Sequence, residues 1–247
     1  MTRAFLGAAL TLVEERYMGS SFDATDEEAV PLAYLSRPRV LRRTQERWPE
    51  LVPTEAKFRD RWVGQQDFLA DFISYALAVR HRRFEKTIAE WAGELTTPGH
   101  DFARAVHAIA YRGMRLMVDL PAFRLQLLAA ASADDDVAAD ILHEAIDSMC
   151  RTLVELHELV VGRFGLRLRP GISSEHVAML LQALAEGLGI RLLAGQESRI
   201  LDPEREASLL GTAALGLFMS LCDPGDGMSV EDAARQFVRA SVSSVTS

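Results

Sequence analysis

The chain has few cysteines and no uninterrupted apolar run of about 18 residues, and each shortage excludes a class of protein. Only Cys150 and Cys222 occur among 247 residues, which excludes a small disulfide-stapled fold and predicts two buried thiols in a reducing compartment. Glu14 and Glu15 interrupt the first apolar segment, where a signal peptide would continue. Since no apolar run is long enough to span a bilayer, we expect a cytoplasmic protein with no membrane partner.

Catalytic and cofactor motifs are also scarce. The sequence has no Gly-rich phosphate loop, no Gly-x-Ser-x-Gly turn and no cysteine or histidine spacing of a zinc site. Residues 134–140 invite comparison with the aspartate-rich metal motif of helical prenyl-diphosphate enzymes, but the spacing is off by one residue. Acids at a helix start interact with unpaired N–H groups instead. We expect no enzyme activity, no cofactor and no metal.

Apolar residues recur three and four positions apart through most of the chain, and the two-residue alternation of strands is scarce. The spacing therefore predicts an all-α fold. A short helix between Asp23 and Leu35 is also possible, and the Ser-rich tail 241–247 is expected to fray. The main helices are predicted at 4–17, 36–48, 54–62, 65–95, 100–119, 122–131, 135–164, 173–195, 204–222 and 229–240.

Positive charge is concentrated in one segment of an acidic chain. The formal net charge is −8, yet the stretch from Arg37 to Arg61 holds eight basic and four acidic residues, a net of +4 that leaves −12 elsewhere. Such a patch is typical of a small nucleic-acid-binding domain attached to an acidic body, and a solvated helix face is the alternative.

The same segment has the pattern of a helix-turn-helix. Two short helices, 36–48 and 54–62, flank a turn, and the second has basic residues on its outer side. Phe58 and Trp62 stand four apart and are predicted to pack in the core of this head. We expect a three-helix head over 1–64, with extra residues at about 18–36. A long helix from residue 65 then joins a helical body over 65–240.

Two stretches resemble the tetracycline-repressor (TetR) family of bacterial regulators. The first, Thr54-Glu-Ala-Lys-Phe-Arg-Asp-Arg-Trp-Val-Gly-Gln-Gln-Asp-Phe-Leu-Ala70, is similar to the recognition helix and the start of the fourth helix. The second, 168–188, is similar to the penultimate helix, where a Pro-Gly turn precedes an apolar segment ending in Gly-Leu. Ala56 stands where the family usually has Gly. Arg59 and Arg61 replace a usual Tyr and His that contact the DNA backbone.

The resemblance implies a dimer that binds an operator in double-stranded DNA through two heads. Residues at the start of the second helix reach base edges, and flanking cations hold phosphates. The base-contact candidates are Thr54, Glu55 and Lys57, and the phosphate candidates are Arg42, Arg43, Arg47, Arg59 and Arg61.

The resemblance also implies a dimer interface on the last two strongly apolar helices and an effector pocket in the body. An internal core is the alternative for both sets. The interface candidates are Leu180, Leu181, Leu184, Leu188, Leu210, Ala213, Ala214, Leu217, Phe218 and Leu221. The ligand-binding candidates are Val106, His107, Ala110, Tyr111, Met114, Met117, Met149 and Cys150.

Two functions from different classes follow. The first is a ligand-responsive transcriptional regulator, a repressor released from its operator by a small apolar or amphipathic molecule. The second is an all-helical enzyme or small-molecule carrier whose head no longer binds DNA, which the altered recognition helix favours.

Overall fold

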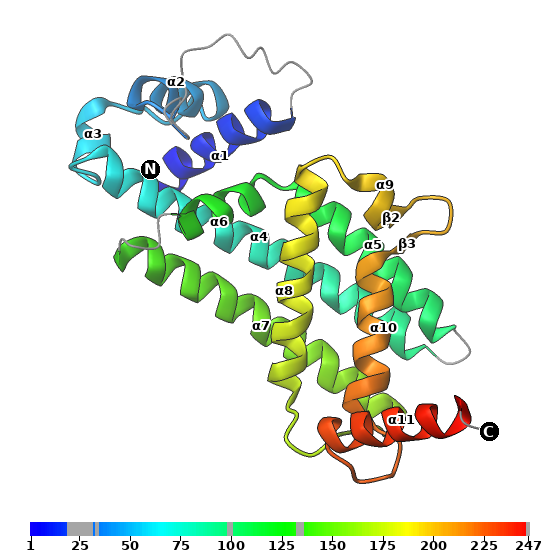
Figure 1. Cartoon of the computed structure of the whole chain (residues 1–247). Helices are drawn as coiled ribbons and strands as arrows, with labels where there is room; N and C mark the ends of the chain where they lie inside the picture. Colours follow the sequence, from blue (N-terminus) through cyan, green and yellow to red (C-terminus); the bar gives the residue numbers. More distant parts are fainter. Residues whose placement is uncertain (19–31, 33–34, 98–100, 132–135, 246–247) are drawn as a thin grey trace. The chain divides into compact units, whose positions relative to one another are not determined.

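The computed structural model describes residues 1–18, 32, 35–97, 101–131 and 136–245 (Figure 1). Within these residues the chain forms eleven helices and four two-residue strands, so the all-α prediction is confirmed. Two compact units divide the chain: Met1–Arg83 with Met117–Ile146, and Phe84–Leu116 with Asp147–Ser247. The first unit thus extends past the predicted head boundary at residue 64. The helix predicted between Asp23 and Leu35 lies outside the described residues, apart from Leu32 and Leu35 themselves.

The first unit contains α1 (Thr2–Met18), α2 (Arg37–Arg47), α3 (Glu55–Arg59) and α6 (Pro121–Ala131). Figure 1 shows α1, α2 and α3 gathered near the beginning of α4. Three longer helices have residues in both units: α4 (Gln65–Thr96), α5 (Phe102–Asp119) and α7 (Asp136–Phe164).

Local signals explain where α2 and α3 begin. Pro38 lies in the first turn of α2, where its missing N–H costs no hydrogen bond. Thr54 caps α3, because its hydroxyl oxygen accepts from the backbone N–H of Lys57 at 3.3 Å. The structure ends α3 at Arg59, three residues earlier than the predicted helix 54–62.

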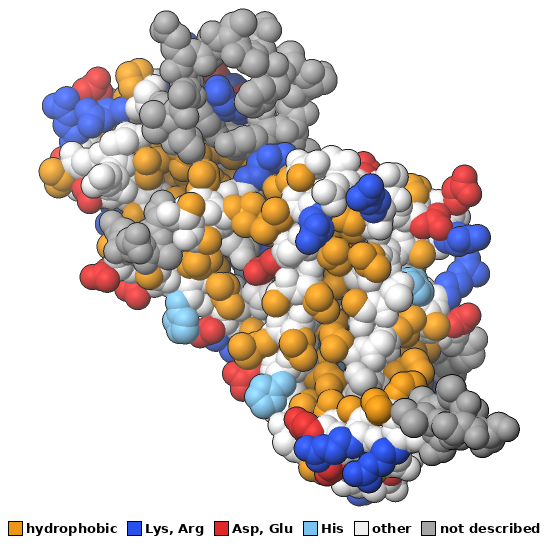
Figure 2. Space-filling view, in the orientation of Figure 1, with side chains coloured by type: hydrophobic (Ala, Val, Ile, Leu, Met, Phe, Trp, Pro, Cys, Tyr) orange, Lys and Arg blue, Asp and Glu red, His pale blue; other side chains and the backbone are white. Residues whose placement is uncertain are grey.

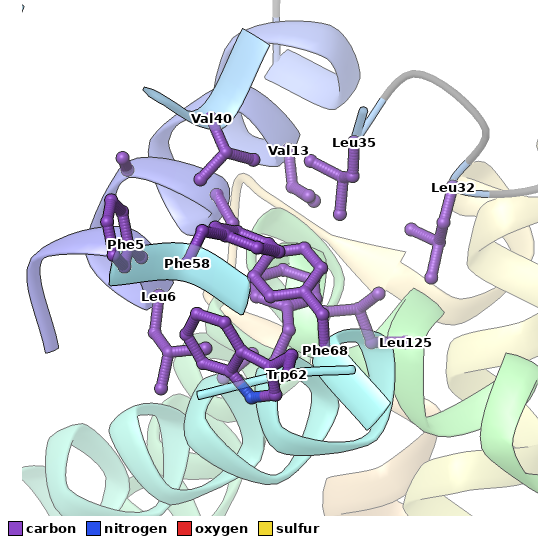
Figure 3. Packing of buried hydrophobic residues seen from close by; sticks show 14 residues of the cluster. Phe5, Leu6, Val13, Leu32, Leu35, Val40, Phe58, Trp62, Phe68 and Leu125 are labelled. Atoms are coloured by element: carbon purple, nitrogen blue, oxygen red, sulfur yellow. The ribbon is translucent and has the colours of Figure 1, made fainter. Parts of the chain in front are cut away.

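A cluster of aromatic rings holds the first unit together (Figure 3). The Phe58 ring centroid lies 4.8 Å from that of Trp62, 5.0 Å from that of Phe68 and 5.4 Å from that of Phe5. All four side chains are at most 2% exposed, which confirms the core prediction for Phe58 and Trp62. Leu125 of α6 packs into the same cluster. Each buried side chain contributes about 1.5–3 kcal/mol.

The second unit contains α8 (Ser174–Leu193), α9 (Glu197–Ile200), α10 (Leu209–Leu221) and α11 (Val230–Val245). Strand β1 (Arg167–Leu168) pairs antiparallel with β4 (Cys222–Asp223). Strand β2 (Leu201–Asp202) pairs antiparallel with β3 (Ala207–Ser208). Helix α8 packs against α10, and Ile88, Trp91, Ile109 and Val160 form a separate core.

Two helix boundaries in this unit were predicted wrongly. The helix expected over 204–222 begins at Leu209 instead, because the chain first turns between β2 and β3. Glu206 adopts a left-handed φ of 47° in that turn, and the Ser208 hydroxyl then caps α10 by accepting from Gly211 N at 3.1 Å. At the other end, α11 continues to Val245, into the tail expected to fray from residue 241.

Buried Arg169, directly after β1, joins the last turn of α10 to the loop that precedes α11. Its side chain is 7% exposed and donates to the Ser220 carbonyl at 2.9 Å, the Asp226 carboxylate at 2.8 Å and the Met228 carbonyl at 3.1 Å. A buried guanidinium requires such partners, since an unpaired charge in the interior is strongly destabilising. Arg169 therefore links the end of α10 to the loop that leads into α11.

Helices α5 and α10 cross closely at Gly211. A Cβ added at Gly211 would lie 2.9 Å from the His107 Cα and 2.6 Å from its Nδ1. Because one of these atoms is backbone, a side chain at this position must push the two helices apart.

We predict that Gly211→Ala lowers the free energy of unfolding by about 1–3 kcal/mol, the usual cost of overpacking. Gly93→Ala in α4 is the matched control, because a Cβ there meets nothing within 4 Å. That control should be neutral or more stable by up to about 1 kcal/mol, since alanine favours a helix. Chemical denaturation of both variants measures the difference, and equal stabilities would contradict the close crossing.

Candidate nucleic-acid interface

The predicted base-contact residues lie at the first turn of α3 and are all exposed. The Thr54 hydroxyl serves as the helix cap, as described above. The Lys57 ammonium donates to the Val52 carbonyl at 2.8 Å, so this side chain turns back onto the loop before the helix. The Glu55 carboxylate lies 3.2 Å from Arg59 Nη2 and 3.8 Å from Arg37 Nη1.

Three of the predicted phosphate-binding arginines have strongly exposed side chains. The exposed fractions are 72% for Arg42, 63% for Arg59 and 54% for Arg61. Each one faces a carboxylate: Arg42 lies 3.9 Å from Glu46, Arg59 is paired with Glu55, and Arg61 lies 2.9 Å from Asp71. These ion pairs are at the surface, where each is worth about 1 kcal/mol or less.

The other two predicted arginines turn toward α1. Arg43 Nη2 lies 2.5 Å from the Glu15 carboxylate and its side chain is 30% exposed. Arg47 donates to the Thr11 hydroxyl, and its guanidinium lies 5.0 Å from the Trp48 ring centroid. Their side chains thus help to hold α2 against α1, while DNA contact by either one stays a prediction.

Two residues of this surface escaped the sequence analysis. Asp71 accepts from both Arg61 and the Trp62 indole N–H, each at 2.9 Å. Arg37 belongs to the basic segment but was not predicted to bind DNA. Its guanidinium lies 5.5 Å from the Phe58 ring centroid. No local sequence pattern predicts the pair of Arg61 with Asp71, which are ten residues apart. The two side chains meet only because of the way in which α3 packs against α4.

An apolar face runs along α8 and α10 (Figure 2). Met179, Leu180, Leu184 and Ile190 of α8 are 38–56% exposed, and Met219 of α10 is 78% exposed. Among the predicted interface residues, Leu180 and Leu184 are exposed and Leu221 is buried. The remaining ones are partly buried: Leu181, Leu188, Leu210, Ala213, Ala214, Leu217 and Phe218.

Contrary to the expectation that no apolar segment is long enough to span a bilayer, helix α8 is long and apolar enough to do so by length and composition alone. It carries Glu175, Gln182, Glu186 and Arg191, which interrupt its apolar sequence. Helices in a protein core or at a subunit interface have the same overall composition as membrane-spanning helices. The length and composition of α8 are therefore compatible with all three environments.

The predicted ligand-binding residues are all buried or partly buried. Met114, Met149 and Cys150 are buried, and the other five are partly buried. His107 faces α10, where its Nδ1 is buried without a hydrogen-bond partner among the described residues. An open hollow of about 550 Å³ lies elsewhere and is lined by Glu197, Ser198, Leu201, Asp202, Pro203 and Glu204. None of the eight predicted residues lines that hollow.

Both cysteines are buried and free, as predicted. Burial raises the pKa of each thiol above its usual value, which keeps the sulfur protonated and unreactive at neutral pH. Within the described ranges, no group of three or more His, Cys, Asp or Glu side chains is placed to hold a metal ion.

His157 of α7 supports the start of α8. Its Nδ1 lies 3.2 Å from the Ser174 hydroxyl, next to the Ser173 cap and its reciprocal bond with His176. Burial lowers the pKa of His157, against the opposing influence of Glu158. The folded state therefore binds a proton less readily than the unfolded chain.

We predict that the free energy of unfolding falls as the pH drops below about 6.5, the ordinary histidine pKa. Below that pH His157 binds a proton in the unfolded chain but not in the folded protein, so acid favours unfolding. The contribution of His157 to the free energy of unfolding is lost completely once the pH is below the lowered pKa of the folded state. Denaturation of the wild type and His157→Gln between pH 7 and pH 5 tests this. The variant should have a shallower dependence on pH, and parallel curves would contradict the assignment.

Comparison with known proteins finds no match: no family model, no curated protein and no solved structure matches this chain. The resemblance to the tetracycline-repressor family therefore rests on the two motifs and on the order of the helices.

Proposed function

We propose that the protein is a dimeric, DNA-binding transcriptional regulator that a small apolar or amphipathic molecule releases from its operator. The observation that carries the proposal is the α2–turn–α3 arrangement. Two short helices are held on one aromatic core through Val40 and Phe58, while Arg42, Arg59 and Arg61 remain at the surface. Exposed basic side chains on and just after the second of two short helices suit the major groove and its flanking phosphates.

The carboxylates beside these arginines are compatible with DNA binding. An exposed ion pair contributes little because water and salt screen it. A phosphate can replace the carboxylate of Glu46 or Asp71 at small cost, since a guanidinium forms paired hydrogen bonds with phosphate oxygens. The ion pairs of these arginines with carboxylates then weaken the attraction of the arginines to polyanions other than the operator. They do not prevent the arginines from binding the operator phosphates.

A second copy of the chain is the partner proposed for the apolar face of α8 and α10. Contiguous exposed apolar side chains on a water-facing surface indicate a protein interface. Two helices from each protomer would form a four-helix interface around a two-fold axis. A dimer then presents two heads to half-sites about 34–36 Å apart, or a multiple of that distance.

Helix α6 could transmit the effect of a bound effector to the DNA-binding helices, because it packs into the same core as α3. Leu125 is fully buried in the core that holds Phe58 and Trp62. Arg80 of α4 donates to Gln126 and lies 5.9 Å from the Phe123 ring centroid. A ligand that prefers a shifted α6 would therefore disturb the packing of α3 and lower operator affinity, provided it binds the two states unequally.

One observation favours a second candidate, a helical enzyme or small-molecule carrier whose head does not bind DNA. Several of the candidate cations have a carboxylate partner within the same unit, and Glu55 places a negative charge on α3 itself. A head that does not bind DNA could have the same ion pairs, because they stabilise its folded structure.

Salt dependence separates the two candidates. We expect the logarithm of the DNA-binding constant to fall linearly with the logarithm of salt concentration, by about 0.9 per phosphate contact. Removing Arg59 and Arg61 by alanine substitution deletes four contacts per dimer, so the slope should become shallower by about 3–4. Fluorescence anisotropy with an operator selected from random duplexes measures both slopes.

Arg205→Ala with Arg235→Ala is the matched control, because these exposed arginines lie in the second unit and removing them causes the same loss of charge. That variant should keep the wild-type slope. If no duplex from a random pool is retained at low salt, the regulator proposal is wrong and the second candidate gains support.

The dimer has its own test. Leu180→Glu with Leu184→Glu places two charges per protomer on the apolar face, and we expect a species of 27.3 kDa in place of one of twice that mass. Val238→Glu, on an exposed position of α11, is the control and should leave the dimer intact. Analytical ultracentrifugation at micromolar concentration distinguishes the species, and a monomeric wild type would contradict the proposed interface.

A further inference from the structure

The contacts around the first turn of α3 distinguish among the three candidates for base recognition. The Thr54 hydroxyl oxygen accepts from the backbone of Lys57 at 3.3 Å as the helix cap. The Lys57 ammonium is bound to the Val52 carbonyl at 2.8 Å. Both side chains therefore serve the local structure of the turn.

Glu55 differs from these two residues because its partners are other side chains at the surface. The residue is the first of α3, and its side chain is 57% exposed. Arg59 Nη2 lies 3.2 Å and Arg37 Nη1 lies 3.8 Å from the same carboxylate oxygen, Oε2. These two cations reduce the electrostatic cost of bringing a carboxylate between the phosphates of two DNA strands.

A carboxylate can only accept hydrogen bonds, and the four bases differ in what they present to it in the major groove. Guanine presents two acceptors, and thymine presents an acceptor and a methyl group, so both repel a carboxylate or leave it without a partner. Adenine presents an amino donor beside the acceptor N7. Cytosine presents an amino donor on N4 and no acceptor of its own in the major groove, and it is the base that suits Glu55 best.

We infer that Glu55 sets the base specificity of the head by selecting cytosine at one position of each operator half-site. The inference rests on the proposed function, since it needs α3 in the major groove. Arg37 and Arg59 lie beside the carboxylate and reduce its repulsion from the phosphates of the DNA.

Selection from a random duplex library with the full-length wild type and with Glu55→Gln tests the inference. The wild type should enrich a motif with cytosine at one position per half-site. The variant should enrich adenine there, because a glutamine amide pairs with both N6 and N7 of adenine. The other positions of the motif should stay the same.

Glu50→Gln is the matched control, since it removes the same charge from an exposed residue in the turn before α3. It should retain the preference for cytosine. A second measurement uses only the wild type: replacing the selected C·G pair with each other pair should weaken binding by about 5- to 100-fold.

The outcomes separate the inference from the proposed function. If the wild type enriches a motif that Glu55→Gln also enriches unchanged, the inference is wrong and the regulator proposal stands. If Glu55→Gln does not fold, the pair-replacement series decides, and equal affinity for all four pairs overturns the inference. A wild-type pool without any enriched motif overturns the proposed function and the inference with it.

Discussion

The packing of Phe58 between Phe5, Trp62 and Phe68 is the interaction on which the first unit depends. Helix α3 has five residues, and a helix of that length does not persist in water by itself. The rings supply the missing stabilisation, because they bury large apolar surfaces at edge-to-face and tilted angles. Once Phe58 is buried, the residues beside it in the helix must point outward.

This constraint explains how the charged side chains around α3 are arranged. Lys57 and Arg59 flank Phe58 and are exposed, and Glu55 and Arg59 face each other one helical turn apart. The Trp62 indole N–H needs a partner when the ring is buried, and Asp71 supplies it. The same carboxylate then binds Arg61. The ion pairs of Arg59 with Glu55 and of Arg61 with Asp71 therefore follow from how the aromatic core orients α3 and the start of α4, and their exposure keeps each one weak.

The second unit depends on different contacts. Gly211 allows α10 to approach α5 at a distance that no side chain would permit, and Arg169 fixes the chain where α10 ends. Ser173 and His157 support the beginning of α8. These contacts fix the positions of α8 and α10. The apolar side chains of Leu180 and Leu184 on α8 remain exposed.

The sequence by itself determined the helical class, the approximate helix ranges and the burial of Phe58 and Trp62, because apolar spacing and caps such as Thr54 are local signals. It did not predict the turn before Leu209. Only the tertiary structure decided which charges far apart in the sequence meet. The pairs of Arg61 with Asp71 and of Arg43 with Glu15 join residues 10 and 28 positions apart, and such contacts exist only after separate helices have packed on a common core.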